Sequence, residues 1–312
     1  MSRKISFKEQ MFRALNALNC YGQSKYQAKK ESYKQGNKGK VKGIYSKKTM
    51  SDYKKVAEQF QSWSKNKGYN FKRLADVSDS HIIQYLKERQ DTGKSAWTIS
   101  RDLSALNKIF SREISKKGTG LKSRKNSDIK NNRGFGNNYR PSIYKKNKEL
   151  TDFLSATGIR RQSITVVSPA DAIRDGQGVV IGFSVVEKGG KSRNCYVIKS
   201  KQNDITSFVD KHQSKSGNKP FWSKADKNLN THWYRSEYAR ALYNDLVSAQ
   251  NNKQDYFNGY RDFFVNSSRL ELTTKKHKQT VKGYDVECLG VVSQCLGHNR
   301  IDVVYANYLS RF

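Results

Sequence analysis

The sequence predicts a mainly α-helical protein with a small antiparallel sheet, divided into two domains. Apolar residues in the first 114 positions recur at the three- and four-residue spacing of amphipathic helices. A stretch from 115 to 139 that is rich in Lys, Asn, Gly and Ser interrupts this pattern. After it, one β-hairpin pattern lies among further helical segments. We therefore expect a helical domain at 1–114, a basic flexible linker at 115–139 and a mixed domain of helices and strands at 140–312.

The first helix is expected to begin at a capping signal. Ser6 and Glu9 have the spacing of a capping box, and Met11 and Leu15 follow on one helical stripe. From about 23 to 48 apolar residues become rare and lysines frequent, so a helix tail and a basic loop are expected there. A solvated charged surface and a contact with phosphate are both open for these lysines.

Three further helices are expected before the linker. One runs from about 51 to 66 with apolar residues on one face. The next starts near Ser78 and ends before Gly93, and the last starts near Ser95 and carries its apolar stripe to Phe110. Together with the first helix they predict a compact four-helix domain.

The second domain mixes helices with one hairpin. A helix is expected from 147 to 155. The apolar, β-branched run Val179–Val186 is followed by a Gly-Gly tip and by Asn194–Ile198, which predicts two antiparallel strands. Further helices are expected over 232–249 and 291–309.

The charge of the chain predicts a polyanionic partner. Lys and Arg number 60 against 27 Asp and Glu, which gives a net charge of +33 spread over the whole chain. Nucleic acid is the commonest polyanion that such a field attracts. On and beside the last helix of the first domain, four polar residues lie away from the apolar stripe, where they can meet a DNA backbone. They are Lys94, Thr98, Arg101 and Lys108.

The cysteines predict a reduced protein without a metal centre. Four cysteines in 312 residues form no disulfide framework, and no apolar run approaches the length of a membrane span. Cys288, Cys295 and His298 lack a fourth ligand and the usual spacing of a zinc site. We expect a cytoplasmic protein with no membrane partner.

Four short segments of the second domain hold residue types suited to phosphoryl transfer. Arg160 follows a glycine in the segment ATGIR, and Lys188 stands at the hairpin tip. His232 and Arg235 lie one helical turn apart, and His298 ends the segment LGH ahead of two tyrosines. Taken singly, each segment is ordinary: a turn, a solvent-facing lysine or a surface pair of side chains.

In this order and spacing the segments resemble the tyrosine recombinase (phage integrase) family. Its pattern is TG-[LIM]-R, a hairpin lysine, H-x-x-R, LGH and a C-terminal tyrosine, and 1–114 is similar to its helical, SAM-like core-binding domain. The resemblance implies an α+β catalytic domain and a site-specific recombinase that cleaves and rejoins DNA through a 3′-phosphotyrosyl intermediate. The catalytic residues that it implies are Arg160, Lys188, His232, Arg235, His298 and a tyrosine near the C-terminus.

The resemblance also implies partners and a setting. The family acts on double-stranded DNA that carries specific recombination sites, as a homo-tetramer, and can use an accessory DNA-bending or directionality factor. Neither a cofactor nor a metal is implied. The expected setting is the nucleoid, where the enzyme would integrate or excise a mobile element or phage.

Two departures from the family pattern indicate a divergent branch carried by phages and mobile elements. Ser163 stands where the family often has an acidic residue, three positions after Arg160. Ser236-Glu-Tyr replaces the common His-Thr/Ser-Phe after Arg235. Without the usual acidic neighbour, Arg160 must be oriented by another group.

The chemistry of these residue types suits such a reaction. Two guanidiniums can clamp both non-bridging oxygens of a phosphodiester under attack, and His298 can donate a further hydrogen bond. His232 is the expected acceptor of the tyrosine proton, and Lys188 on its hairpin can protonate the leaving 5′-oxygen. The arginines then supply the electrostatic stabilisation that Mg²⁺ gives elsewhere.

The sequence favours Tyr308 as the nucleophile. The family usually places its tyrosine about nine residues after the LGH histidine, and Asn307 stands in that position. Tyr308 comes one residue later, and a one-residue insertion between helices is easily accommodated. Tyr305 is the alternative, but one helical turn after Ile301 it is also suited to packing on the apolar face.

Other readings of the sequence stay open. A type IB topoisomerase resembles the family in its active-site residues, and a catalytically inactive DNA-binding regulator would keep the charge without the chemistry. Residues 1–48 are expected as an elaborated first helix, although a separate arm-site module is the alternative. Only four residues follow Tyr308, so the coupling of protomers is left open, with insertion of the tyrosine helix itself as one option.

Overall fold

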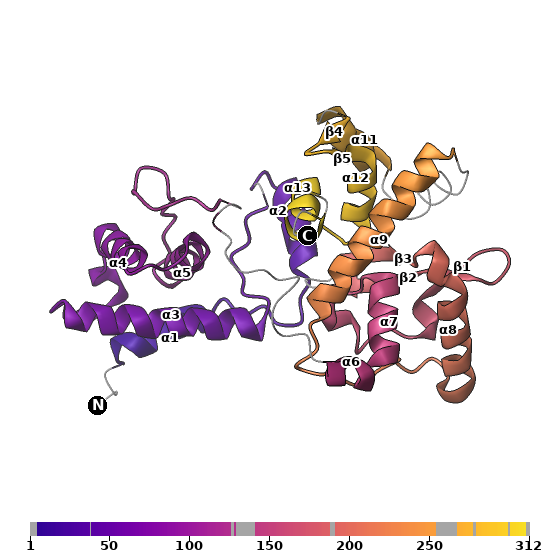
Figure 1. Cartoon of the computed structure of the whole chain (residues 1–312). Coiled ribbons are helices and arrows are strands. Elements are labelled where there is room, and N and C mark those ends of the chain that lie inside the picture. The colour runs from indigo at the N-terminus through magenta and orange to yellow at the C-terminus, as the bar shows by residue number, and fades with distance from the viewer. Residues whose placement is uncertain are drawn as a thin grey trace. The chain divides into compact units, whose positions relative to one another are not determined.

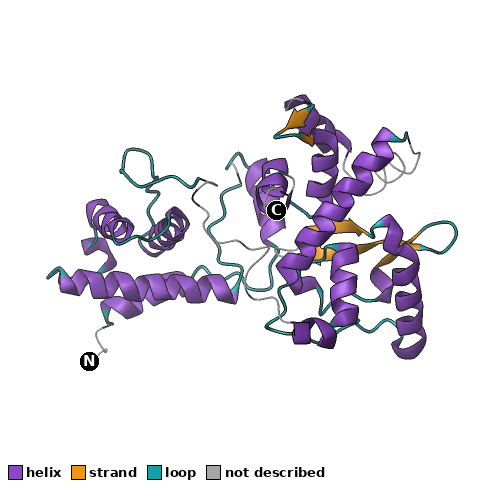
Figure 2. Cartoon of the chain, in the orientation of Figure 1, coloured by secondary structure: helices purple, strands orange, loops and turns teal. Residues whose placement is uncertain are grey.

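The computed structural model describes residues 5–37, 39–125, 128, 141–187, 191–253, 267–276, 279–298 and 300–309. It divides into two compact units, Met1–Asp128 and Ile129–Phe312 (Figure 1). Helices dominate and strands are few, which confirms a mainly α protein with a small antiparallel sheet (Figure 2). Within these residues, no helix combines the length and the apolar character needed to cross a membrane.

The first unit is built from short helices that begin at serine caps. They are α1 (Phe7–Asn16), α2 (Lys25–Lys34), α3 (Lys47–Asn66), α4 (Asp79–Asp91) and α5 (Ala96–Ile109), with a 3₁₀ turn η1 (Leu74–Asp76). In each of these α-helices the serine before the first turn accepts a backbone N–H. The caps at Ser78 and Ser95 agree with the sequence, and α3 begins four residues before the expected start.

One aromatic-rich core holds α1, α3, α4 and α5 together. Met11 and Leu15 of α1 are fully buried there, as is Phe60 of α3. The Phe60 ring lies edge-on to Tyr85 at 5.3 Å and to Phe110 at 5.4 Å between centroids. These ring contacts join α3, α4 and the end of α5.

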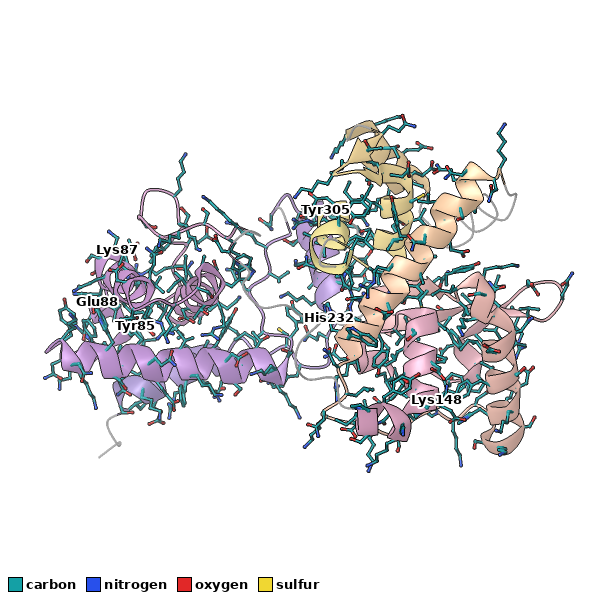
Figure 3. All side chains as sticks on the ribbon, viewed as in Figure 1. Tyr85, Lys87, Glu88, Lys148, His232 and Tyr305 are labelled. Carbon is teal, nitrogen blue, oxygen red and sulfur yellow. The ribbon has the colours of Figure 1, made fainter. Side chains whose placement is uncertain are left out.

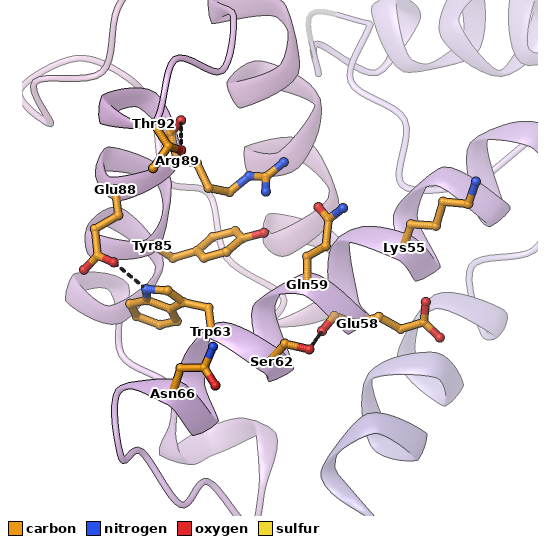
Figure 4. A pocket seen from close by; sticks show the side chains of 10 residues that line it. All are labelled: Lys55, Glu58, Gln59, Ser62, Trp63, Asn66, Tyr85, Glu88, Arg89 and Thr92. Atoms are coloured by element: carbon orange, nitrogen blue, oxygen red, sulfur yellow. Dashed lines mark hydrogen bonds between the residues drawn. The ribbon is translucent and has the colours of Figure 1, made fainter.

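A pocket lies between α3 and α4 of this unit (Figure 4). The Trp63 indole N–H donates to the Glu88 carboxylate at 2.9 Å across it. The Tyr85 hydroxyl is buried and, among the described residues, has no hydrogen-bond partner. Burial raises the pKa of this phenol. The side chains that line the pocket belong to none of the four phosphoryl-transfer segments.

Helix α2 occupies part of the region expected as a basic loop, so that expectation was wrong for Lys25–Lys34. Ser32 is the buried residue of this helix, and its hydroxyl donates to the Lys40 carbonyl at 2.7 Å. Without an apolar stripe the helix has no periodic signal, and the cap at Ser24 is the feature that marks its start.

The first part of the expected linker packs onto the first unit. Leu121 is buried in the helical core, and the Lys116 ammonium donates to the carbonyls of Ala96 and Lys122 at 3.3 and 2.7 Å. A single apolar anchor in a polar stretch gives no periodic pattern, so composition alone predicts flexibility here. Residues 126–127 and 129–139 of the expected linker lie outside the described residues.

The second unit combines helices with a three-stranded sheet. Its α-helices are α6 (Pro141–Lys146), α7 (Lys148–Thr157), α8 (Gln202–Ser216), α9 (Thr231–Asn251), α11 (Ser267–Lys276), α12 (Val286–Cys295) and α13 (Ile301–Val304), and the last continues as a π-helical turn η6 (Tyr305–Leu309). Short 3₁₀ turns are η3 (Arg161–Ser163), η4 (Pro169–Asp171) and η5 (Lys199–Lys201). The strands are β1 (Ala172–Arg174), β2 (Val180–Glu187), β3 (Lys191–Tyr196), β4 (Thr280–Val281) and β5 (Tyr284–Asp285).

The expected hairpin forms two of the three strands of the sheet, with β2 at its centre. Strands β2 and β3 pair antiparallel from Gly182 opposite Tyr196 to Glu187 opposite Lys191, and β1 pairs with the other edge of β2. Residues 188–190 at the hairpin tip, with Lys188 among them, lie outside the described residues. The sequence pattern gave no sign of β1, which is only three residues long.

The helix expected over 291–309 is broken in the structure. Helix α12 ends at Cys295, and the chain turns at Gly297, whose φ of 68° lies in the left-handed region. A side chain with a Cβ rarely adopts this conformation, which is why a glycine marks the break. The tyrosines therefore lie on a separate segment, α13 with η6, beyond the turn.

Candidate active site

Three of the four phosphoryl-transfer segments meet at the ends of helices of the second unit, and the Lys188 segment lies outside the described residues. Arg160 follows the C-terminus of α7, and His232 and Arg235 lie in the first turns of α9, which starts at the Asn230 cap. Figure 3 shows His232 near the start of α9 and Tyr305 on the last helical segment. The candidate side chains that the fold brings together are Arg160, His232, Arg235, His298 and Tyr308.

The end of α12 is a Schellman motif built on the glycine of LGH. The Gly297 N–H donates to the Gln294 carbonyl at 2.7 Å, and the His298 N–H donates to the Ser293 carbonyl at 2.8 Å. These bonds use carbonyls of the last helical turn. The carbonyls that come after them, beginning at Cys295, are left for other donors.

Arginine side chains donate hydrogen bonds to those carbonyls. The Arg160 guanidinium donates to the Leu296 carbonyl at 3.1 Å, and Arg235 donates to the same carbonyl. Arg193 of β3 donates to the Cys295 carbonyl. Because the C-terminal end of a helix carries partial negative charge, it attracts these guanidiniums and offsets part of their mutual repulsion.

Both motif glycines are required by close approach. Gly158 ends α7 with φ 60°, and its carbonyl accepts from Arg235 and from Arg193, the latter at 3.5 Å. A Cβ on Gly158 would lie 2.3 Å from the Tyr238 ring. A Cβ on Gly297 would lie 2.8 Å from Cδ of Arg193. The TG-x-R and LGH glycines therefore let two chain turns close around the same arginines.

The Tyr308 hydroxyl lies inside this cluster. It is 2.9 Å from Nε2 of His298 and accepts from Nε of Arg235 at 3.3 Å. The His232 ring stacks on the phenol ring with centroids 5.2 Å apart and planes inclined by 12°. Tyr308 is buried at 4% exposure, and its side chain is held by contacts from α9 and from the turn after α12.

Burial and the clustered charges shift the titration of these groups. Burial lowers the pKa of Arg160 to about 10, with Arg235 and Arg193 adding to the effect. Burial also lowers the pKa of Arg235, and Tyr308 opposes that shift. The pKa of His298 falls to about 3 because the imidazole is buried and faces the arginines. At neutral pH, Arg160 is therefore charged and His298 is neutral.

Tyr305 and Asn307 make their contacts outside the arginine cluster. The Lys282 ammonium lies 5.3 Å from the centroid of the Tyr305 ring, which packs at the edge of the hydrophobic core. The Asn307 side chain donates to the Val303 carbonyl at 3.1 Å. Among these three positions, the contacts with His298 and Arg235 belong to Tyr308.

Arg193 is the residue of this cluster that sequence reasoning missed. On β3, Arg193 shares a face with the fully buried Cys195 and pairs with the buried Val185. A charged residue at such a core-facing position of a strand is the feature of the sequence that could have indicated it. The sequence predicts that Arg160 needs an orienting group, because residue 163 is not acidic. The carbonyls of Leu296 and Gly297 orient it by accepting hydrogen bonds from its guanidinium.

Ser163 itself is buried beside this site. Its side chain is 1% exposed, and its hydroxyl has no hydrogen-bond partner among the described residues. Cys288 and Cys295 are buried, and neither forms a disulfide. Over the part of the chain that the structure describes, no three His, Cys, Asp or Glu side chains gather as metal ligands.

Comparison with known protein families finds a match within the first unit. Residues 40–117 match the model of the phage integrase N-terminal SAM-like domain. This match covers 78 of the 312 residues, so it shows similarity to that domain family over this segment. The match covers the front of the chain, and the motif segments around Tyr308 lie in the second unit. The search of curated proteins found no significant match.

Two solved recombinase structures are similar to the chain at low identity. One is XerH site-specific recombinase bound to palindromic difH substrate in a post-cleavage complex, with 15% identity, a TM-score of 0.45, and coverage of 89% of this chain and 98% of that one. The other is XerH bound to difH substrate in a pre-cleavage complex, also at 15% identity and TM-score 0.45, with coverage of 87% and 97%. Both TM-scores lie below 0.5.

The four predicted DNA contacts of the first unit have different surroundings. Lys94 is exposed in the turn before α5, and Thr98 faces the Ser95 cap with its hydroxyl 3.1 Å from the serine oxygen. Arg101 pairs with the buried Asp102 at 2.8 Å. Lys108 donates to the Val41 and Lys42 carbonyls. Its burial lowers its pKa. Lys108 thus ties α5 to the loop before α3, whereas Lys94 lies open to solvent.

Proposed function

We propose that the chain is a site-specific DNA recombinase that cleaves and rejoins double-stranded DNA through a 3′-phosphotyrosyl bond on Tyr308. The observation that carries this proposal is the position of the Tyr308 oxygen, 2.9 Å from Nε2 of His298 and 3.3 Å from Nε of Arg235. A phenol, a neutral imidazole and clustered guanidiniums are the groups that attack on a phosphodiester requires.

In the first step the Tyr308 oxygen attacks the scissile phosphorus, and the bond from phosphorus to the 5′-oxygen breaks. Arg160 and Arg235 clamp the non-bridging oxygens, where negative charge grows. Arg235 has two N–H groups beyond its three bonds to Gly158, Leu296 and Tyr308. It can therefore bind phosphate without leaving its helix-end carbonyls.

His298 is the proposed acceptor of the phenol proton. The sequence favoured His232 for this part, but the 2.9 Å contact joins Tyr308 to His298, while the His232 ring packs face-on against the phenol. Without DNA the pKa of His298 is held near 3 by burial and by the arginines. A bound phosphate brings compensating negative charge, which raises that pKa when the reaction needs a base.

Lys188 is the proposed donor to the leaving 5′-oxygen, as the family resemblance implies for the lysine at the β2–β3 hairpin tip. The phosphotyrosyl bond retains the energy of the broken phosphodiester, so attack by a 5′-hydroxyl reverses the step without ATP. Exchange between two sites needs two pairs of protomers, and the proposed assembly is a homo-tetramer on DNA that integrates or excises a mobile element.

The test is capture of a covalent protein–DNA adduct. The full chain is incubated with a pool of nicked duplexes of random sequence around the nick, and adducts that survive detergent are collected. Wild-type protein and Tyr305→Phe are expected to form them, and Tyr308→Phe is expected to form none. Retention of adduct by the Tyr308→Phe protein would overturn the choice of nucleophile.

The same experiment separates the alternatives. If the wild-type protein binds the pooled duplexes but forms no covalent adduct, the result would indicate a DNA-binding regulator and count against a recombinase. Selected sites are then placed in pairs on a supercoiled plasmid. Recombinant products are expected, whereas relaxation at the same rate with and without the sites would indicate a topoisomerase.

A further inference from the structure

Arg193 is buried in the middle of the catalytic cluster although none of the four motif segments contains it. Its side chain is 9% exposed on β3, the second strand of the hairpin whose tip carries Lys188. A charged side chain at a core-facing position of a strand is costly unless its hydrogen bonds are made. Its neighbours in the fold must therefore provide polar groups.

The guanidinium of Arg193 joins two chain turns that are far apart in sequence. It donates to the Cys295 carbonyl at the end of α12 and to the Gly158 carbonyl at the end of α7, the latter at 3.5 Å. Arg160 lies two residues after the second acceptor, and His298 lies three residues after the first. One side chain thus bridges the turns that carry two of the proposed catalytic groups.

Arg193 shares contact partners with the other two arginines of the cluster. The Gly158 carbonyl accepts from both Arg193 and Arg235. A Cβ placed on Gly297 would lie 2.8 Å from Cδ of Arg193 and 3.2 Å from Nη1 of Arg160, so both side chains pack on that glycine. The positions of Arg160 and Arg235 are therefore limited by where Arg193 lies.

We propose that Arg193 is a positioning residue of the recombination reaction, which holds the Gly158 and Gly297 turns together so that Arg160 and Arg235 meet the scissile phosphate in register. This inference rests on the proposed function. Arg193 need not touch DNA, because its hydrogen bonds to Cys295 and Gly158 are to backbone carbonyls inside the unit.

The first measurement is single-turnover adduct formation by Arg193→Met on duplexes selected by the wild-type protein. Methionine keeps an apolar side chain in the space and removes the guanidinium. We expect the rate to fall about 100-fold, since a misplacement of about 1 Å costs that much, while DNA affinity stays within about threefold of wild type. Arg193→Lys keeps the charge but cannot reach both carbonyls, so it is expected to restore only part of the rate.

A matched control is Arg174→Met on β1 of the same sheet. Arg174 donates to the Gly178 carbonyl at 2.7 Å and pairs with Asp210, outside the cluster. The Arg174→Met protein should cleave DNA at the wild-type rate. An Arg193→Met protein that is folded and cleaves as fast as Arg174→Met would overturn the inference while leaving the proposed function intact.

A double variant distinguishes positioning from a general loss of structure. If Arg193 acts through Arg160, Arg160→Lys combined with Arg193→Met should be no more than about threefold slower than Arg160→Lys alone. Losses that multiply would show that Arg193 acts independently and would count against the proposal.

A further measurement does not depend on DNA cleavage. Amide exchange at Gly297 and His298 in the free protein should be about tenfold faster in Arg193→Met than in Arg174→Met, because the α12 end loses its tie to α7. Equal exchange in the two variants would refute the proposed tie even if no DNA substrate were cleaved.

Discussion

His298 is predicted to make the second unit lose stability in mild acid. Its ring is buried and faces the guanidiniums of Arg235, Arg160 and Arg193, which together lower its pKa from 6.5 to about 3. At pH 5 the unfolded chain binds a proton on this imidazole and the folded chain does not. The free energy of unfolding therefore rises with pH between the two pKa values and falls as pH drops below about 6.5.

The size of the effect follows from the two pKa values. Inside this window each pH unit changes the free energy of unfolding by about 1.4 kcal/mol. From pH 7 to pH 5 the folded second unit should lose about 2 kcal/mol through His298 alone. His298→Gln keeps a hydrogen-bonding group near Tyr308 but does not titrate, so it should lack this contribution.

The assay must report on the second unit. Trp63 and Trp97 belong to the first unit, and Trp222 and Trp233 belong to the second. Replacing the first pair by Phe in the full chain leaves fluorescence that follows unfolding of the second unit in urea. Measuring this chain with and without the His298→Gln substitution at pH 7 and pH 5 isolates the histidine, because all other titrating groups are common to both.

The refuting result is an equal pH dependence. If the two chains lose the same stability between pH 7 and pH 5, within about 0.5 kcal/mol, His298 is not held neutral by burial and by the arginines. The proposal that it waits as a neutral base would then fail as well.

Three other perturbations test the contacts and the charge. Arg235→Lys should slow adduct formation about 10²- to 10³-fold with little change in DNA affinity, since one ammonium cannot replace donors to Gly158, Leu296 and Tyr308; a parallel collapse in affinity would contradict a clamp role. Gly158→Ala should destabilise the second unit by about 1–3 kcal/mol in thermal unfolding, because the new Cβ meets Tyr238 at a positive φ; an unchanged Tm would argue against this crowding. With a net charge of +33, DNA affinity should fall steeply on a plot of log Kd against log salt; a flat line would rule out a binding surface made of phosphate contacts.

Local sequence signals predicted the elements that have a cap or a regular period. The serines at 78 and 95 marked the starts of α4 and α5, and the β-branched run before the Gly-Gly step predicted the β2–β3 hairpin. Helix α2 and strand β1 were missed because neither carries a periodic apolar pattern long enough to recognise. The helix expected over 291–309 was too long because the turn at Gly297 depends on its backbone angle.

The sequence by itself determined which chemical groups are present, because guanidinium, imidazole and phenol are properties of residue type, and their order along the chain resembles the pattern of one family. Only the tertiary structure decided which of these groups meet. Arg193 stands 33 positions after Arg160 on a strand with no motif, yet donates to the same Gly158 carbonyl as Arg235. Such contacts arise from helix ends and strand faces packed together, and carbonyls carry no signature in a sequence. The reactive groups could therefore be predicted from the sequence, whereas the contacts that orient them could not.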